Sequence, residues 1–418
     1  MKKLIFHPII ATYLGFQTAS MLAVSFCFVT YVPFLAERGM NLWQINVINS
    51  FYMGFVLLSE MPTGSFADTF GRGRSLSLSC LLLSVGALAY FFASSFWLFI
   101  IAEIIIAIAH TFSSGAAEAW LVDSLKVRGE SSLQPWVFRQ EQHFKSAGNI
   151  IGALAGAYLG GFDLGWPWLA VAGLMLLVGL FSLKIKEHHQ VSQEKSSQTS
   201  LNCQLKSAWN HGIRSPDLLL IMSFGACLAF SVQALNMQWA LLFKTEYGLT
   251  SPELGWVYVG IAVSMALGAR FSKKVSHLLK EKSALIIPQL LTAGAIIACA
   301  LAGKLFIIAT AFFIHEFGRG IIGPLRKHFL NERIPSHNRA TVLSLDSMFS
   351  KLGALGGLLI TGLIAEQFSI RTAWIFSGLS LFLSVIIFFL IIKKEEKWQG
   401  PKFKVLSRKK VAESAYLS

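Results

Sequence analysis

The sequence predicts an all-α polytopic membrane protein, and three observations carry this fold class. Hydrophobic residues make up 54% of the 418 residues and charged residues only 14%, whereas soluble chains usually carry about 25% charged residues. The mean hydropathy is +0.58. The apolar residues stand in blocks of about 20, the length that a helix needs to cross the hydrocarbon layer. Because lipid cannot hydrogen-bond an open backbone, each block is expected to be a helix.

Twelve such blocks follow one another along the chain. We expect membrane spans at residues 8–34, 44–66, 75–95, 97–124, 138–160, 166–184, 217–243, 253–271, 284–302, 305–326, 341–365 and 372–392. The first six form an N-terminal bundle (1–184) and the last six a C-terminal bundle (217–392). A polar cytoplasmic linker (185–216) joins them, and a basic cytoplasmic tail (393–418) follows.

The formal net charge of +14 raises the question of a nucleic-acid partner, which the placement of the charges answers. Only four Lys and Arg residues fall in the predicted outer loops: Arg38, Lys244, Lys304 and Arg371. Almost all the others fall on the cytoplasmic side if the N-terminus is cytoplasmic, as the positive-inside rule requires. The basic balance therefore indicates an inner-membrane protein in contact with anionic lipid, and no nucleic acid is predicted.

Cysteine usage and loop composition argue against a cofactor. Four of the five cysteines lie inside predicted spans and the fifth, Cys203, lies in the linker, so neither a disulfide framework nor metal-ligand spacing is present. No phosphate-binding glycine loop occurs. The first apolar run extends to Leu35, which is too long for a signal peptide. We therefore expect an uncleaved first span, no metal, no cofactor and no enzyme activity.

An internal repeat relates the two halves. The segment H-T-F-S-S-G begins at His110, and H-E-F-G-R-G begins 205 residues later at His315. At this fixed offset, residues 110–152 match residues 315–357 at ten of 43 positions, as expected if the two halves arose by duplication. Two six-helix halves in the same orientation imply a pseudo-twofold axis along the membrane normal, with a substrate site between the halves.

The loop after the second span carries the most specific motif. It reads G-S-F-A-D-T-F-G-R-G-R from Gly64 to Arg74. It resembles the loop signature of the major facilitator superfamily, G-x-x-[A/S]-D-x-x-G-R-[K/R]-x, although Gly73 stands where a basic residue is usual. With the spans, halves and linker, the resemblance covers nearly the whole chain. It implies a monomeric secondary transporter that moves a small molecule by rocking its two halves.

The resemblance also implies that this loop latches the halves in the outward-facing state. We expect Gly64 and Gly71 to permit a tight turn and close helix approach. Asp68 is expected to bond the N-terminus of a neighbouring helix. The predicted latch residues are Gly64, Asp68, Gly71, Arg72, Arg74 and Asp123.

The arginines of this loop have two possible readings. Either Arg72 or Arg74 pairs with Asp123 at the end of the fourth span, or both are simple cytoplasmic charges in a turn. The corresponding loop of the second half begins at Gly268 and lacks the aspartate and the second glycine. The latch is therefore expected on one side only.

The fifth span holds glycines at 148, 152, 156, 160 and 161. Its end, G-x-x-x-G-A-x-x-G-G, resembles the antiporter motif of drug-exporting members of the superfamily, with Ala157 in place of proline. Small residues at this spacing also serve ordinary helix packing in membranes. The motif thus favours export without deciding it.

Charges inside the spans are the candidates for substrate binding or proton coupling, because a charge at the centre of a span costs about 2.5–3.5 kcal/mol. In the tenth span, Glu316 and Arg319 are three residues apart and are expected to pair on one face. The pair either binds substrate and exchanges a proton, or only links helices.

Further charges stand in the fifth and eleventh spans. Glu141 and Lys145 share a face and are either functional or solvated near the membrane surface. Asp346 and Lys351 are five residues apart, so we expect them to have separate partners. His110 and His315 suit proton relay but also fit helix contacts. Glu118 is either a protonation site or a structural group.

Other polar groups within the spans give a less specific indication of function. Glu60 and Glu103 allow the same two interpretations as Glu118, and neutral groups of the first and seventh spans either bind substrate or join helices. These neutral residues are Gln17, Gln233, Asn236, Gln238 and Trp239.

The sequence therefore predicts a proton-coupled transporter that most resembles drug exporters. Uptake of a nutrient or metabolite is the alternative within transport. From other classes, a membrane-embedded enzyme or a non-transporting sensor remains possible. The enzyme is disfavoured because the cytoplasmic loops are short and basic, and a sensor would be indifferent to neutralisation of the charges within its spans.

Overall fold

Helices account for almost all of the described chain, as the hydropathy pattern predicts. The computed structural model describes residues 7–185, 216–279, 281–334 and 339–395, and no strand occurs within them. Nine helical stretches of these residues are long and apolar enough to cross a membrane. The predicted linker (185–216) and tail (393–418) lie almost entirely outside the described residues, so the predicted domain limits and the count of twelve spans stay predictions.

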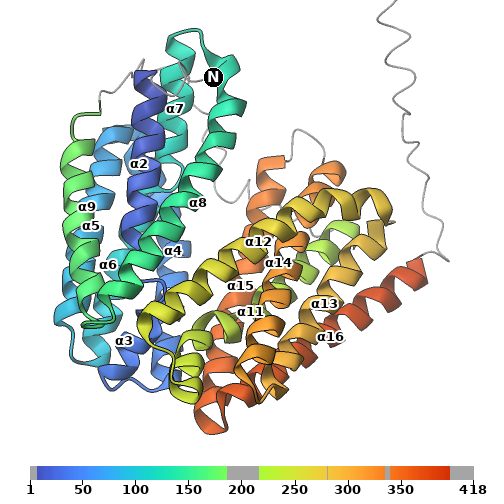
Figure 1. Ribbon diagram of the computed structural model, residues 1–418. Helices are drawn as coiled ribbons and strands as arrows, with labels where there is room; N and C mark the ends of the chain where they lie inside the picture. The colour runs from blue at the N-terminus through green and yellow to red at the C-terminus, as the bar shows by residue number, and fades with distance from the viewer. Residues whose placement is uncertain (1–6, 186–215, 280, 335–338, 396–418) are drawn as a thin grey trace, which may run out of the picture.

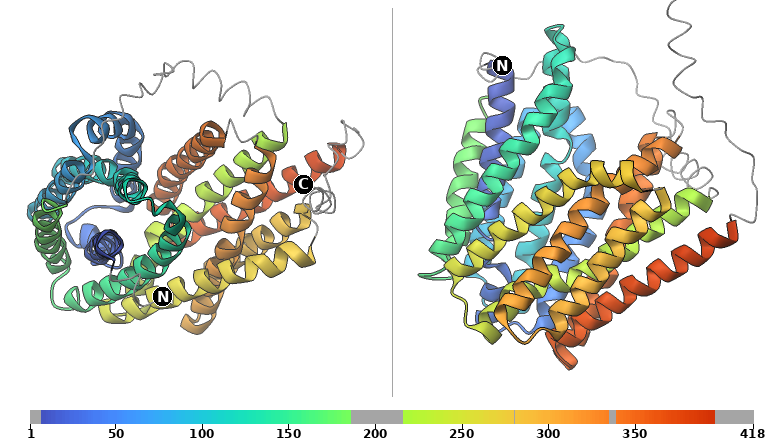
Figure 2. Two further views of the ribbon diagram at one scale, coloured as in Figure 1. Left: turned by 90° about the horizontal axis from the view of Figure 1, so that it is seen from above. Right: turned by 45° about the vertical axis from the view of Figure 1, so that its right-hand side comes forward.

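The helices form two groups (Figure 1). The first contains α2 (Pro8–Ser25), α3 (Tyr31–Glu37), α4 (Leu42–Phe70), α5 (Arg72–Phe92), α6 (Phe96–Ser113), α7 (Ala116–Val127), the 3-10 helix η1 (Ser131–Leu133), α8 (Gln134–Leu159) and α9 (Trp166–Ser182). The second contains α11 (Pro216–Tyr247), α12 (Ser251–Leu278), α13 (Glu281–Leu301), α14 (Leu305–Arg333), α15 (Arg339–Gln367) and α16 (Ile370–Glu395). The groups meet at one end and diverge at the end that carries the N-terminus (Figures 1 and 2).

The first predicted span is two helices rather than one. Between α2 and α3, the amides of Phe26 and Cys27 bond carbonyls three residues back, at 3.3 Å each, instead of continuing the α-helical pattern. Pro33 lies in the first turn of α3, where a proline is tolerated because its missing N–H would have no partner there. The predicted continuous helix over residues 8–34 is therefore wrong at this point.

The fourth predicted span is also interrupted, between α6 and α7. Gly115 has φ +75°, a conformation that glycine adopts without steric penalty. Its repeat partner, Gly320, stays inside the continuous helix α14, where a Cβ atom would lie 2.3 Å from the carbonyl oxygen of Met265. The same glycine of the repeat breaks a helix in one half and permits close helix packing in the other.

The glycines of α8 form a seam against α2. A Cβ atom on Gly152 would lie 2.1 Å from the carbonyl oxygen of Leu22, and one on Gly156 would lie 1.9 Å from that of Phe26. No side chain fits at these positions, because the two backbones are in direct contact. By sequence, the glycines of the fifth predicted span fit either an antiporter motif or ordinary helix packing. The backbone contacts account for them by helix packing.

The second half repeats the seam between α15 and α11. A Cβ atom on Gly353 would lie 2.2 Å from the carbonyl oxygen of Ala226, and one on Gly357 would lie 2.3 Å from that of Phe230. Gly353 and Gly357 are the repeat partners of Gly148 and Gly152 at the offset of 205. The internal repeat therefore corresponds to a repeated helix contact.

The two groups touch closely at the end opposite the N-terminus. Gly255 of α12 packs against α8, where its Cβ atom would lie 2.6 Å from the Cβ of Ala157. The amide of Leu42, at the start of α4, donates to Oε2 of Glu366 in α15 at 2.9 Å. These contacts close the space between the groups at that end.

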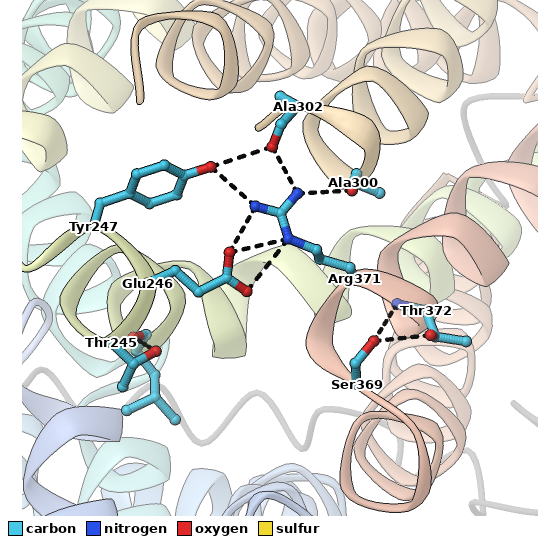
Figure 3. A network of polar contacts seen from close by, with 9 residues as sticks. Thr245, Glu246, Tyr247, Ala300, Ala302, Ser369, Arg371 and Thr372 are labelled. Atoms are coloured by element: carbon cyan, nitrogen blue, oxygen red, sulfur yellow. Dashed lines mark hydrogen bonds and ion pairs between the residues drawn. The ribbon is translucent and has the colours of Figure 1, made fainter. Parts of the chain in front are cut away.

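The same end of the second group is fixed by Arg371, in the first turn of α16 (Figure 3). Its Nη1 donates to the carbonyl oxygens of Ala300 at 2.9 Å and Ala302 at 2.7 Å. Its Nη2 donates to Oε2 of Glu246 at 2.6 Å and to the hydroxyl of Tyr247 at 2.9 Å. One guanidinium thus joins the ends of α11, α13 and α16.

The glycine seam predicts a position-specific loss of stability. Gly156→Ala should lower the unfolding midpoint in detergent, because the added methyl group meets the backbone of Phe26 and overpacking costs about 1–3 kcal/mol. Gly173→Ala is the matched control, since a Cβ atom on Gly173 meets nothing within 4 Å. Thermal unfolding of the purified variants checks this, and equal midpoints would show that the seam is not tight.

Candidate functional site

A cavity of about 440 Å³ lies between the two groups of helices. Both groups line it, with aromatic side chains such as Tyr31 and Trp168 from the first and Trp239 and Phe312 from the second. Ligand sites are typically apolar clefts with a few convergent polar groups. Of the described residues that line this cavity, three carry a charge: Glu103, Glu316 and Arg319.

A polar bridge crosses between the groups beside the cavity. Asn149 of α8 accepts hydrogen bonds at Oδ1 from the hydroxyl of Ser25 in α2, at 2.9 Å, and from that of Tyr258 in α12, at 3.1 Å. Tyr258 itself lines the cavity. A single amide therefore links both groups at the cavity wall.

Glu316 and Arg319 are paired, as their spacing predicts. Nη1 of Arg319 lies 2.9 Å from Oε1 of Glu316 and also donates to Oδ1 of Asn236 on α11 at 2.9 Å. The Glu316 side chain is only 2% exposed, whereas that of Arg319 is 20% exposed. The carboxylate is thus buried behind a guanidinium that faces the cavity, and a role of the pair in coupling stays a prediction.

His315 lies behind this pair. Its side chain is fully buried, its Nδ1 lies 3.3 Å from Oε1 of Glu316, and its ring stacks on Phe312 with centroids 5.8 Å apart. It is not among the residues that line the cavity. Contact of His315 with substrate would therefore require a change of conformation, whereas contact with Glu316 already exists.

Asp346 and Lys351 have separate partners, as predicted. Asp346 pairs with Arg326 of α14, within the second group. Lys351 lies 2.6 Å through its Nζ from Oε1 of Glu60, which belongs to α4 of the first group. Among the ion pairs of the described residues, Lys351–Glu60 is the one that joins the two groups.

Glu141 and Lys145 also pair, at 2.9 Å, and the pair is part of a larger network. The hydroxyl of Tyr13 donates to Oε2 of Glu141 at 2.5 Å, and Nε2 of Gln17 donates to Oε1 at 3.0 Å. Both partners lie on α2, so the carboxylate joins α8 to the first helix. The sequence predicts Lys145 as a partner of Glu141 but not Tyr13, because the packing of α2 against α8 is tertiary structure that local spacing does not give.

His110 and Glu118, the remaining titratable residues of the prediction, do not line the cavity themselves. His110, near the end of α6, is exposed and its ring lies 6.1 Å from that of Tyr52, which does line the cavity. Glu118 is exposed in the first turn of α7. The structure therefore brings His110, but not Glu118, next to the cavity.

The predicted ion pair forms beside the turn between α4 and α5. Arg72, rather than Arg74, pairs with Asp123 of α7, and its Nη2 lies 3.9 Å from Oδ1 of Asp68. Arg74 is exposed. All of these contacts lie within the first group, so the latch role stays a prediction.

Two details of that loop differ from the expectation. Gly71 makes the turn, with φ +104°, but Gly64 lies inside α4, and a Cβ atom there would meet nothing within 4 Å. Asp68 is 75% exposed and lies beside the side chain of Arg72, the first residue of α5, whose N-terminus has no side-chain cap. In this conformation the expected close approach at Gly64 and the expected bond of Asp68 to a helix N-terminus are not seen among the described residues, and the part of both residues in a latch stays a prediction.

Glu103, for which the sequence allows the same two interpretations as for Glu118, lines the cavity. It lies in α6, is 4% exposed and accepts a hydrogen bond from the hydroxyl of Tyr90. A lone carboxylate in the apolar run F-W-L-F-I-I-A-E-I-I-I-A-I-A was the available signal, because such groups in spans mark functional positions.

No metal site emerges from these groups. Across the residues that the structure describes, no three His, Cys, Asp or Glu side chains are gathered in a way that would hold a metal ion.

Comparison with known proteins agrees with this architecture. The family model described as Major Facilitator Superfamily matches residues 14–268 and 219–416. The MFS-type transporter YxaM of Bacillus subtilis is 23% identical over 91% of this chain and 95% of its own length. Multidrug resistance protein 2 of B. subtilis is 22% identical over 78% and 82%. The crystal structure of the nucleoside transporter NupG superposes with a TM-score of 0.77 at 13% identity, over 92% and 99%.

The buried pair predicts a non-additive effect on stability. Arg319→Gln should destabilise the fold by an amount near the lower end of the roughly 3–5 kcal/mol typical of breaking a buried pair, because Glu316 stays buried without its cation. Adding Glu316→Gln should restore most of this loss. Unfolding midpoints of the single and double variants test this, and a double variant less stable than Arg319→Gln would contradict it.

Proposed function

Because the chain belongs to the Major Facilitator Superfamily, we propose that it is a proton-coupled transporter of the bacterial inner membrane that exports a small organic solute. The observation that carries the proposal is the cavity between the two groups of helices, which both groups line. A site shared by two halves changes its access when the halves rock against each other. The multi-pass architecture and the family's use of small-molecule substrates fit this role.

The direction in which the cavity opens supports loading from the cytoplasm. The groups are in close contact where Gly255 meets Ala157 and diverge at the end that carries the N-terminus (Figure 2). The positive-inside rule assigns that end to the cytoplasm. On this topology, the structure is the inward-open state, in which an exporter receives its substrate.

Proton coupling is supported by the chemistry of the cavity wall. Glu316 is bonded to Arg319, and a carboxylate that exchanges a cationic partner for a proton changes the charge of the wall by one. Such an exchange can favour one orientation of the halves over the other, because a lone buried charge is costly. His315, at 3.3 Å from Glu316, is a second group able to carry that proton.

Export is favoured over uptake by two considerations. The cavity wall is mainly apolar and aromatic, which suits an amphipathic solute better than a sugar. One relative that covers most of the chain is named as a multidrug resistance protein. Uptake of a metabolite through the same cavity is the second candidate.

Cellular accumulation of a broad panel of small molecules tests direction and coupling together. In an efflux-deficient host, expression should lower accumulation of some compounds, and a protonophore should abolish the effect. The Glu316→Gln/Arg319→Gln variant should lose at least about tenfold of the transport rate, while Gly173→Ala should retain it. Higher accumulation would indicate uptake, and an effect that survives the protonophore would contradict proton coupling.

The ion pair between the groups predicts a shift between conformations. Lys351→Gln removes its contact with Glu60, and because the pair is partly exposed its contribution is at most about 1 kcal/mol, or about fivefold in population. Spin labels at Lys126 and His277, in a background without native cysteines, report the separation of the diverging ends. The inward-open population should fall, and Lys304→Gln, an exposed control, should leave it unchanged.

The opposite result would be equally informative. An unchanged or larger separation in the Lys351→Gln protein would mean that this pair does not stabilise the open state.

A further inference from the structure

Given the proposed transport function, we infer that Glu103 binds the positive charge of the transported molecule, and that the substrate class is a hydrophobic organic cation. Glu103 lies in the cavity wall and is 4% exposed. Its position is seven residues from the start of α6, about 10 Å from that end of the helix at 1.5 Å per residue. It is therefore a carboxylate deep in a membrane protein.

Glu103 has hydrogen bonds but no cation. The hydroxyl of Tyr90 donates to its Oε2, and the hydroxyl of Tyr31 lies 3.5 Å from its Oε1, at the limit of a hydrogen bond. None of the ion pairs between described residues includes it. The other carboxylate of the cavity, Glu316, has its own guanidinium.

When its carboxyl groups are ionised, the cavity has a negative charge balance. Its lining contains two carboxylates, Glu103 and Glu316, and one guanidinium, Arg319. Nη1 of Arg319 bonds both Glu316 and Asn236. With all three groups ionised the count is one minus two, or minus one, in a chain whose formal net charge is +14. A ligand with one positive charge completes the balance.

The surroundings of Glu103 suit a large cation. Tyr31 and Trp168 line the cavity beside it, with ring centroids 6.2 Å apart, and Trp168 is fixed by stacking on Tyr90 at 4.0 Å. Aromatic faces attract cations within about 6 Å, most strongly when water is excluded. The combination of a carboxylate and aromatic faces recognises an ammonium or phosphonium group with apolar substituents.

The same carboxylate would couple this cation to a proton. A carboxyl group that holds a proton has no charge with which to hold a cation, so the two ligands exclude each other. The titratable groups around Glu103 are Tyr31 of α3, Tyr52 of α4 and Tyr90 of α5, with His110 two turns along α6. His110 is exposed, and its ring lies 6.1 Å from that of Tyr52, which lines the cavity.

Binding in detergent tests the assignment without requiring transport. The probe is tetraphenylphosphonium, with triphenylphosphine oxide as a neutral relative, and proton release is followed with an indicator in weakly buffered solution. The unmodified protein should bind the cation at least about tenfold more tightly than the neutral compound and release a proton. Glu103→Gln should lose at least about tenfold in cation affinity and release no proton, while its affinity for the neutral compound stays the same.

Glu37→Gln, an exposed carboxyl at the end of α3, is the matched control and should behave like the unmodified protein. Glu103→Asp should recover part of the cation binding, and the comparison of the two probes on the unmodified protein holds even if Glu103→Gln does not fold. Equal affinity for both probes, or cation binding that survives Glu103→Gln, would overturn the assignment. Cation binding that depends on Glu103 without transport in cells would support it and count against the proposed transport function instead.

Discussion

Burial of charge without water is the constraint on which the interior of this protein depends. A charge at the centre of a membrane helix costs several kcal/mol unless a partner or a water-filled space receives it. Glu316 has Arg319, Asp346 has Arg326, and Glu141 has a hydroxyl, an amide and an ammonium group. In each case at least one of these partners belongs to a neighbouring helix or lines the cavity. The positions of the charges therefore report which helix faces point inward.

In both halves, polar side chains and glycines of one helix make contacts with its neighbours. On α8, Glu141 contacts α2 through side chains, and Gly152 contacts it through backbone. On α15, Asp346 reaches α14, while Gly353 lies against α11. Hydrophobic burial does not drive helix association in lipid, so close packing and polar bonds carry it instead. The internal sequence repeat thus corresponds to glycine contacts at matching positions in both halves.

Much of this arrangement could be predicted from the sequence because it is local. Apolar blocks give the helices, and the spacing of Glu316 and Arg319 gives their pairing. The break near Phe26 could not be predicted, because the apolar pattern runs through it unbroken. The partner of Lys351 could not be predicted at all. Glu60 lies 291 residues away, and only the packing of α4 against α15 brings them together.

Glu103 was seen but not ranked, for a related reason. In the sequence it is one of several carboxyl groups within spans, and nothing local separates it from Glu118. The structure separates them by surroundings: Glu118 is exposed, whereas Glu103 is buried in the cavity wall beside the hydroxyls of Tyr90 and Tyr31. Function in such proteins follows the orientation of helix faces, and a single sequence determines that orientation only weakly.

The duplicated scaffold can serve one substrate site only if its copies differ at the cavity. In the first half, the repeated frame ends at Gly115, which breaks the helix, and the cavity carboxylate Glu103 stands without a cation. In the second half, Gly320 keeps α14 continuous, and the frame itself carries Glu316 and Arg319 as a neutral pair. An unpaired carboxyl group in one half and a neutral ion pair in the other make the two sides of the cavity different. Two identical halves would contain either two unpaired carboxyl groups or two neutral ion pairs. Because an unpaired charge in lipid is costly, an arrangement with a single unpaired carboxyl group costs less than one with two.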